Sequence, residues 1–238
     1  MFKAKLSLQS LFAGLVVLAV PVVLVMGVIR LLLNPWYPEF EYRTPGFPDD
    51  PYGFTLEDRL VYSKIAIEYV VNQADISFLG EQRFPAGVTA PPLSCQFMDD
   101  CNLMYNEREL EHMLDVKIVV GAALRVWVAA LAVVFVGAVW AWRGGWWKEF
   151  RQALHRGGWL TILLIGIVIG LTLLAFGFFF VFFHQVFFES GTWSFYYTDT
   201  LIRLFPERLW RDTFLMVGVL SGIGGLLLGL RVFPPWRK

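Results

Sequence analysis

Long apolar stretches dominate the pattern of hydrophobic and polar positions along this chain of 238 residues. Four stretches reach the roughly 20 residues that a helix needs to cross about 30 Å of hydrocarbon, namely residues 11–33, 118–142, 159–188 and 214–233. The first is too long for a secretory signal and no small-residue cleavage motif follows it, so we interpret it as an uncleaved anchor. The pattern predicts an all-α membrane protein whose four transmembrane helices form a single integral membrane domain over residues 1–238.

The positions of Lys and Arg predict how these spans are oriented, because cytoplasmic flanks carry an excess of basic residues. Lys3 and Lys5 precede the first span, four basic residues lie in 143–158, and Arg231, Arg237 and Lys238 lie at or after the end of the last span. We therefore expect both termini and the loop 143–158 to be cytoplasmic. Residues 34–115 and 189–213 are then extracytoplasmic, and the chain is expected to be a multi-pass protein of the cell membrane with a large outer segment between helices 1 and 2.

The composition agrees with lipid as the main solvent of the chain. Hydrophobic residues make up 57% of it and charged residues 17%, against about 45–50% and about 25% in soluble domains. We therefore expect membrane lipids, and no nucleic acid, among its partners. The net charge of zero conceals a segregation, since residues 34–115 hold 15 acidic and five basic residues. Two cysteines are too few for a zinc or iron–sulfur site built on cysteine.

The outer segment contains signals for local structure. Residues 34–54 hold five prolines and are predicted to be extended, and residues 84–96, with three more, are predicted to be irregular. Thr55 with Asp58 three residues later is a variant of the capping box, which predicts a helix from there through Gln73.

A second helix is predicted to start in the outer segment and to enter the membrane. Asn106 is a cap candidate with Glu109 three residues later, and no helix breaker follows before the span 118–142. Cys95 and Cys101 lie just upstream. On the oxidising outer side they are a possible disulfide that closes a short loop.

Small and charged residues inside the spans indicate helix packing and a polar recess. Arg125 lies about two turns inside its span, where a charge is expensive, so we expect it to face protein or water unless it snorkels to the headgroups. Glycines spaced four apart predict close helix contacts in the third and fourth spans: Gly166 and Gly170, Gly218 and Gly222, Gly225 and Gly229.

Two of the three histidines are predicted to lie at the same depth. His112 is six residues before Ile118, or about 9 Å along a helix, and His184 is 25 residues beyond Trp159, or about 38 Å. Both positions correspond to the outer membrane–water boundary. Two imidazoles there could form a base and acid pair near neutral pH, or each could simply bind a neighbouring loop. His155, in the basic loop, is interpreted as a solvated histidine.

Acidic and basic residues accompany the two histidines. Glu111 and Asp115 flank His112, and Asp115, at i+3, could orient the imidazole. Asp199 and Arg203 lie in the second outer segment. The alternative for most of these charges is a solvated surface position.

Three stretches taken together resemble a known family. They are E-L-E-H-M-L-D-V-K at 109–117, F-H-Q-V-F-F at 183–188, and W-S-F-Y-Y-T-D-T-L-I-R-L-F-P-E-R-L-W-R-D at 193–212. The chain resembles the four-span integral membrane family that contains the bacterial lipoprotein intramolecular transacylase. The resemblance implies an acyltransferase that moves the sn-2 acyl chain of a diacylglyceryl-modified lipoprotein to the α-amine of its N-terminal cysteine. The product is the lyso-form lipoprotein.

These observations lead to a set of expected roles. We expect His112 to be the general base and His184 its acid or oxyanion partner, with no cofactor and no metal. Asp115 would orient His112, and Arg125 or Arg203 would stabilise the oxyanion or position the peptide carbonyl. Glu111 and Asp199 complete the candidate site, which would face the extracytoplasmic side.

Three other classes of function remain open from the sequence. The chain could be a non-catalytic membrane scaffold or sensor whose outer segment binds a partner. It could be a thiol–disulfide membrane protein that uses Cys95 and Cys101. It could also hold a metal ion on His112, His184 and nearby acids. The Phe-rich run 176–188 could line an acyl groove, or it could simply face lipid.

Overall fold

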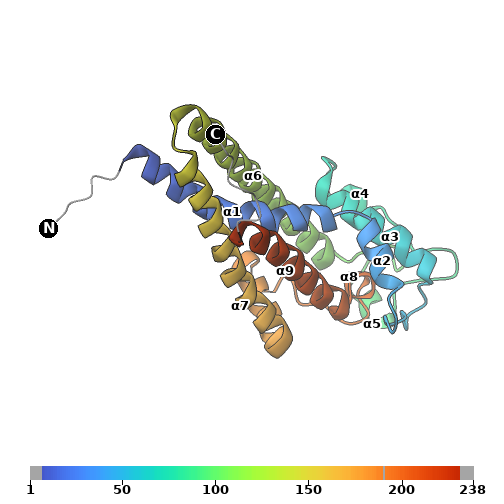
Figure 1. Cartoon of the computed structure of the whole chain (residues 1–238). Helices are drawn as coiled ribbons and strands as arrows, with labels where there is room; N and C mark the ends of the chain where they lie inside the picture. The colour runs from blue at the N-terminus through green and yellow to red at the C-terminus, as the bar shows by residue number, and fades with distance from the viewer. Residues whose placement is uncertain (1–6, 190, 231–238) are drawn as a thin grey trace. The chain divides into compact units, whose positions relative to one another are not determined.

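The computed structural model describes residues 7–189 and 191–230, and every regular element within these ranges is a helix (Figure 1). The helices are α1 (Leu8–Leu32), α2 (Trp36–Tyr42), α3 (Leu56–Val71), α4 (Ser77–Gly80), α5 (Pro92–Cys95), α6 (Glu107–Gly144), α7 (Trp147–Phe187), α8 (Thr200–Leu204) and α9 (Glu207–Gly229).

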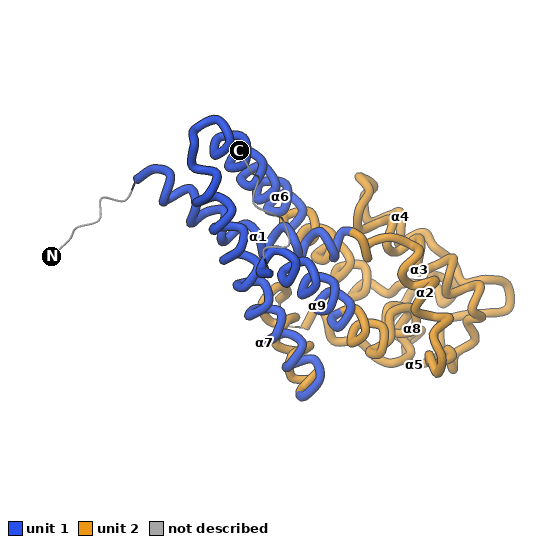
Figure 2. The backbone as a smooth tube through the Cα atoms, in the orientation of Figure 1, with its two compact units in different colours: residues 1–30, 123–174, 214–238 blue, residues 31–122, 175–213 orange. Residues whose placement is uncertain are grey.

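The chain divides into two compact units (Figure 2). Unit 1 comprises residues 1–30, 123–174 and 214–238, and unit 2 comprises residues 31–122 and 175–213. The long helices α6 and α7 each contribute residues to both units.

Four helices, α1, α6, α7 and α9, are long and apolar enough to cross a membrane. They contain the four predicted spans almost completely, which confirms the prediction of an all-helical protein with four membrane-spanning helices. Residues 231–233, the end of the predicted fourth span, lie outside the described residues. The side of the membrane on which the termini and the outer segment lie stays a prediction.

Unit 1 is held by close backbone approaches between helices. A Cβ atom on Gly158 of α7 would lie 2.6 Å from the backbone oxygen of Gly225 of α9, and one on Gly157 would lie 2.6 Å from Cβ of Val20 of α1. Glycine is therefore required at these crossings, as expected where helices associate in lipid. The indole Nε1 of Trp127 in α6 donates to the backbone oxygen of Val23 in α1 over 3.2 Å.

The predicted glycine contacts are correct only in part. Gly218 approaches Ile169, and Gly225 approaches the backbone of α7, as the spacing predicts. A Cβ on Gly166 or Gly170 would meet nothing within 4 Å among the described residues, so the prediction that these two glycines mark a helix contact is wrong. Spacing alone does not say which side of an apolar helix faces a neighbour.

The predicted loop 143–158 is mostly helical. After α6 ends at Gly144, Gly145 takes a positive φ of 72°, which reverses the chain with little steric cost. The next helix then starts at Trp147. Trp146 is buried in this turn against Phe150, and that contact fixes the start of α7.

Unit 2 has its own apolar core. The cluster includes Tyr69 of α3, Leu79 of α4, Met113 of α6 and Leu204 of α8, all buried. Both predicted helix caps are confirmed. Thr55 and Asp58 form a reciprocal capping box at α3.

At the start of α6 the Asn106 and Glu109 side chains each accept from the backbone N–H of the other residue, over 3.0 Å. The helix then continues unbroken to Gly144. The capped start places His112 in the second turn of α6.

The prediction that residues 34–54 are extended is wrong for α2. Pro35 is the N-cap of this helix and Pro38 lies in its first turn, where the missing N–H groups would have no partner within the helix. Tyr37 and Tyr42 are buried, and the Tyr42 hydroxyl donates to the backbone oxygen of Leu204 over 2.6 Å. These tertiary contacts stabilise a seven-residue helix that would be marginal alone.

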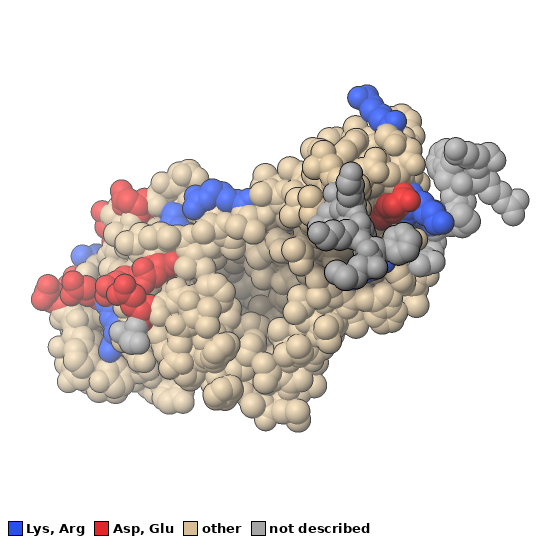
Figure 3. Space-filling view, turned by 90° about the vertical axis from the view of Figure 1, so that its left-hand side faces the viewer, with Lys and Arg blue, Asp and Glu red and all other residues tan. Residues whose placement is uncertain are grey.

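Charged side chains are unevenly distributed on the face shown in Figure 3. Most of this face carries no charged residue, and Lys, Arg, Asp and Glu are gathered in separate patches. Large uncharged surfaces of this kind are expected where a protein contacts lipid.

Candidate active site

The two histidines of the predicted pair lie close together in unit 2. His112 is in the second turn of α6 and His184 is in the last turn of α7. Their ring centroids are 6.0 Å apart and their planes are inclined by 24°. A group of a few atoms between or beside the rings can therefore contact both imidazoles.

Aromatic side chains enclose the pair. Phe188 and Phe195 pack edge-on against His112, with centroid distances of 4.9 and 5.3 Å. Phe180 and Trp193 lie 4.2 and 5.0 Å from the ring of His184. His112 is only 8% exposed, and such an apolar enclosure favours the neutral imidazole.

One hydrogen bond determines the tautomer of His184. Its Nδ1 lies 2.8 Å from the backbone oxygen of Phe180. A carbonyl oxygen only accepts, so Nδ1 of the neutral ring carries the proton and Nε2 keeps its lone pair. The Nδ1 atom of His112 is buried without a hydrogen-bond partner within residues 7–189 and 191–230. His184 is therefore the histidine that the fold orients as a proton acceptor.

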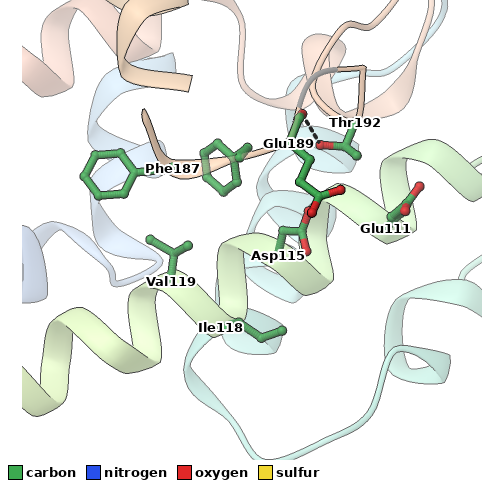
Figure 4. A pocket seen from close by; sticks show the side chains of 8 residues that line it. Glu111, Asp115, Ile118, Val119, Phe187, Glu189 and Thr192 are labelled. Carbon is green, nitrogen blue, oxygen red and sulfur yellow. Dashed lines mark hydrogen bonds between the residues drawn. The ribbon is translucent and has the colours of Figure 1, made fainter. Parts of the chain in front are cut away.

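A pocket of about 320 Å³, which we name the acidic pocket, adjoins the pair through Phe188 (Figure 4). The carboxylates of Asp115 and Glu189 point toward each other across it, and Thr192 donates to the backbone oxygen of Glu189 over 3.1 Å. Its lining residues come from α6 and from the end of α7 with the segment that follows: Glu111, Asp115, Ile118, Val119, Phe187, Phe188, Glu189 and Thr192.

A second pocket of about 420 Å³, the arginine pocket, shares Glu111 and Thr192 with the first. It lies at the start of α6. Its lining residues are Phe97, Asn106, Glu107, Arg108, Glu111, Gly191 and Thr192.

Asp199 is not a solvated surface charge. Its side chain is fully buried and forms an ion pair with Arg108 over 3.3 Å. It also accepts from the Ser94 hydroxyl over 2.7 Å, from the Asn106 amide over 3.3 Å and from the backbone N–H of Tyr196 over 2.9 Å. Asp199 therefore joins three separate segments of unit 2.

Arg203 is also buried, and it pairs with Asp50 rather than with a histidine. Nε and Nη2 of Arg203 donate to the two carboxylate oxygens of Asp50 over 3.0 and 2.9 Å. The guanidinium lies 3.8 Å from the ring centroid of Phe54. These contacts fix the position of the 34–54 segment. They also engage the guanidinium of Arg203, which we expected near an oxyanion.

The remaining candidates fall outside the histidine pair. Arg125 is exposed and belongs to unit 1. Cys95 and Cys101 form a disulfide in unit 2. No group of three or more His, Cys, Asp and Glu residues in the described ranges is arranged to hold a metal ion.

Sequence reasoning did not identify several residues of the site. Glu189 and Arg108 line the two pockets, and Phe195 and Trp193 enclose the imidazoles. Arg108 lies four residues before His112, so helical spacing could have placed it on the same face. The aromatic residues come from an irregular segment, and no periodicity could have placed them.

Comparisons with known proteins agree with this architecture. A family model described as lipoprotein intramolecular transacylase Lit matches residues 14–210. An uncharacterized protein of Aquifex aeolicus is 27% identical over 221 residues, which cover 93% of each chain.

Among solved structures, the membrane-integral lipoprotein intramolecular transacylase Lit of Bacillus cereus has a TM-score of 0.72 at 17% identity, covering 92% of both chains. A variant of that protein with one histidine replaced by alanine gives 0.66 at 17% identity, covering 92% of this chain and 90% of the other. These similarities, together with the four apolar helices, support a multi-pass membrane fold.

Proposed function

The chain belongs to the lipoprotein intramolecular transacylase Lit family, and on this premise we propose that it transfers the sn-2 acyl chain of a diacylglyceryl lipoprotein to the α-amine of the N-terminal cysteine. Family membership implies a lipoprotein intramolecular transacylase in general. The proposal specifies the ester that reacts, the amine that accepts and the residues that assist. The substrate is a diacylglyceryl-modified lipoprotein held in membrane lipid, and the product is the lyso form.

The single observation that carries the proposal is the pair formed by His112 and His184. In the reaction the amine nitrogen attacks the ester carbonyl carbon, an amide bond forms, and the ester bond to the glycerol oxygen breaks. The amine loses a proton and the glycerol oxygen gains one. Two imidazoles with centroids 6.0 Å apart can serve these two proton transfers.

The hydrogen bonds favour different roles for the two imidazoles. Because Nδ1 of His184 is tied to the backbone oxygen of Phe180, its Nε2 is suited to accept the amine proton. That carbonyl also stabilises the imidazolium that results. His112 then assists the leaving oxygen or the oxyanion. This assignment exchanges the roles that we expected from the sequence, where His112 was the base.

The aromatic enclosure supports acyl transfer rather than hydrolysis. Water competes with the amine for the ester, and an apolar wall of Phe188, Phe195 and Trp193 around the rings reduces its access. Since donor and acceptor belong to one molecule, holding them together supplies much of the rate. An α-amine with a pKa near 8 requires only a modest base.

Mass spectrometry of a synthetic lipopeptide tests the proposal directly. Purified full-length protein in detergent is incubated with a diacylglyceryl lipopeptide that has a free N-terminal amine. Intramolecular transfer leaves the total mass unchanged and moves one acyl chain onto nitrogen. Fragmentation should therefore give an N-acylated cysteine fragment. A substrate labelled in the sn-2 chain shows which ester donates.

The outcome that contradicts the proposal is equally specific. Loss of one acyl mass would indicate hydrolysis, and transfer of the unlabelled sn-1 chain would contradict the proposed donor. An unchanged lipopeptide would favour a scaffold or sensor role. A matched lipopeptide with an acetylated N-terminus is the control, and it should remain unmodified.

A further inference from the structure

The arginine pocket is the feature of unit 2 that the acyl-transfer step leaves without a role. It shares Glu111 and Thr192 with the acidic pocket but is not lined by either histidine. Its most distinctive member is Arg108, which lies at the start of α6.

Arg108 is held in position from three sides. Its Nη2 donates to Asp199, whose side chain has no exposed surface. The guanidinium carbon lies 5.8 Å from the ring centroid of Phe97 and 5.3 Å from that of Tyr196. These two rings stack on each other, with centroids 5.7 Å apart and planes inclined by 8°. A long side chain is thus ordered before any ligand binds.

The ion pair does not use up the donors of Arg108. Asp199 also accepts from Ser94, Asn106 and the backbone of Tyr196, so other groups satisfy much of this carboxylate. About a third of the Arg108 side chain, 32%, remains exposed. A guanidinium carries five N–H donors in a planar fork, which suits carbonyl and carboxylate oxygens.

The register along α6 relates this pocket to the reacting groups. Arg108 and His112 are four residues apart, so they share one face and differ by about 6 Å in height. An extended peptide advances roughly 3.3 Å per residue. A polypeptide that leaves the imidazole along this face therefore passes Arg108 about two residues later.

We propose that the arginine pocket binds the first residues of the polypeptide that follow the substrate cysteine, with Arg108 donating to a backbone carbonyl oxygen. This inference rests on the proposed function, because it takes the N-terminal cysteine to react beside His112. The ring of Phe97, which stacks on Tyr196, lines the pocket and provides a flat surface for the peptide planes. The disulfide between Cys95 and Cys101 closes the loop that carries Phe97.

The occupant follows from the geometry of the substrate. Its acyl chains remain in lipid while its polypeptide must leave toward water, and a pocket at the start of α6 lies in that direction from His112. A backbone carbonyl is present in every lipoprotein sequence. Recognition through Arg108 would therefore tolerate many substrates.

Binding of unreactive lipopeptides tests the inference apart from catalysis. Dissociation constants are measured with the full chain in detergent for two N-acetylated ligands, diacylglyceryl-cysteine amide and a diacylglyceryl lipopeptide of five residues. Acetylation blocks the acceptor amine. We expect the longer ligand to bind about tenfold more tightly, which is typical of a charge-assisted hydrogen bond. Arg108→Lys should remove most of this difference while keeping the charge beside Asp199.

Two further variants separate binding from folding. Phe97→Ala removes the aromatic wall at a side chain that is 50% exposed, and it should weaken only the longer ligand. Arg83→Lys is the matched control. Arg83 pairs with Asp100 in the same unit over 2.8 Å but lines neither pocket, so it should change neither constant.

The results distinguish this inference from the proposed function. If the wild type binds both ligands equally, or if Arg108→Lys and Phe97→Ala preserve the preference for length, the peptide subsite is wrong. Arg108 would then serve only Asp199 or a lipid headgroup. If the length preference depends on Arg108 but a free-amine lipopeptide is not converted, the binding site stands and the acyl-transfer proposal fails.

Discussion

The two units of the chain are stabilised by different interactions. In unit 1, apolar helices approach until backbone meets backbone, as Gly158 and Gly225 do. In unit 2, short helices are tied by buried charges, capping boxes and a disulfide, as Asp199 and Arg203 illustrate. Lipid gives no hydrophobic force between helices, so the stability of unit 1 depends on how closely its helices fit together. Unit 2 depends on polar groups with fixed partners.

This difference explains why the candidate site lies in unit 2. Acid–base chemistry needs groups with defined tautomers and exposure, and these follow from hydrogen bonds such as that between His184 and Phe180. Close packing of apolar helices provides no such groups. The two kinds of stabilisation should therefore respond differently to substitution.

The largest expected effect is on activity at the histidine pair. We expect His112→Ala and His184→Ala each to lower kcat by about 10²- to 10⁴-fold, because each removes a proton-transfer group. The double variant should be little worse than either single variant, since residues that act as a unit are not additive. The measurement is the rate at which purified protein converts a diacyl lipopeptide.

His155→Ala is the matched control for the pair. His155 lies in α7 within unit 1 and should leave kcat unchanged. Near wild-type conversion by His184→Ala would show that the paired mechanism is wrong. His112 would then have to act with a carboxylate such as Asp115.

The largest expected effect on stability is at the buried ion pair of unit 2. Arg203→Met leaves the Asp50 carboxylate without its cation, and both side chains are almost fully buried. We expect a loss of about 3–5 kcal/mol in the free energy of unfolding. Chemical denaturation in detergent, monitored by tryptophan fluorescence, measures it.

The exposed pair of Arg83 and Asp100 provides the comparison. Its side chains are 60% and 38% exposed, so Arg83→Met should cost only about 0–1 kcal/mol. Equal losses at the two sites would mean that burial of Arg203 does not determine its contribution. If Arg203→Met folds but loses activity, the result would instead support the role near the oxyanion that the sequence predicts for Arg203.

Sequence reasoning succeeded where the signal was local. Hydropathy predicted the four long helices, and the Thr55 and Asn106 motifs predicted two helix starts. It failed at α2, because the burial of Tyr37 and Tyr42 overrides the signal of five prolines. The spacing of residues in the sequence does not indicate which residues distant in the chain contact each other in the structure.

The histidine pair shows what can and what cannot be predicted from residue spacing. Helix length allowed a matched depth for His112 and His184 to be inferred, because rise per residue is fixed. The aromatic side chains that surround the two imidazoles could not be inferred, since Phe195 and Trp193 lie in an irregular segment. The partner of Asp199 was also hidden, because Arg108 is 91 residues away in the sequence.

The next expected effect is on stability, at the close contact between α7 and α9 in unit 1. Gly158→Ala would place a Cβ 2.6 Å from the backbone oxygen of Gly225, and backbone cannot move aside as a side chain can. We expect a loss of about 1–3 kcal/mol and a lower melting temperature in detergent. Gly166→Ala is the control, because a Cβ there meets nothing within 4 Å and alanine favours the helix. Destabilisation by both variants to the same degree would show that helix contact is not the cause.

The last expected effect is a dependence of stability on pH in unit 2. Glu41 is 3% exposed. Burial, a hydrogen bond with Asp212 and the negative charge of Asp212 raise the pKa of Glu41 to about 7 from its usual 4.5, and Arg208 partly offsets them. The folded protein thus favours neutral Glu41. Its contribution to stability is complete below about pH 4.5 and is lost as the pH rises through about 7.

The variant Glu41→Gln, which cannot ionise, isolates this contribution. It should match the wild type near pH 4.5 and become more stable than the wild type by about 3 kcal/mol above pH 7, because only the wild type must then bury a charge. Unfolding in detergent at several pH values measures the difference. Glu39→Gln, with an exposed side chain on the same helix, is the control and should stay within about 0.5 kcal/mol throughout. A difference between Glu41→Gln and the wild type that is constant with pH would show that the pKa of Glu41 is the same in the folded and the unfolded protein.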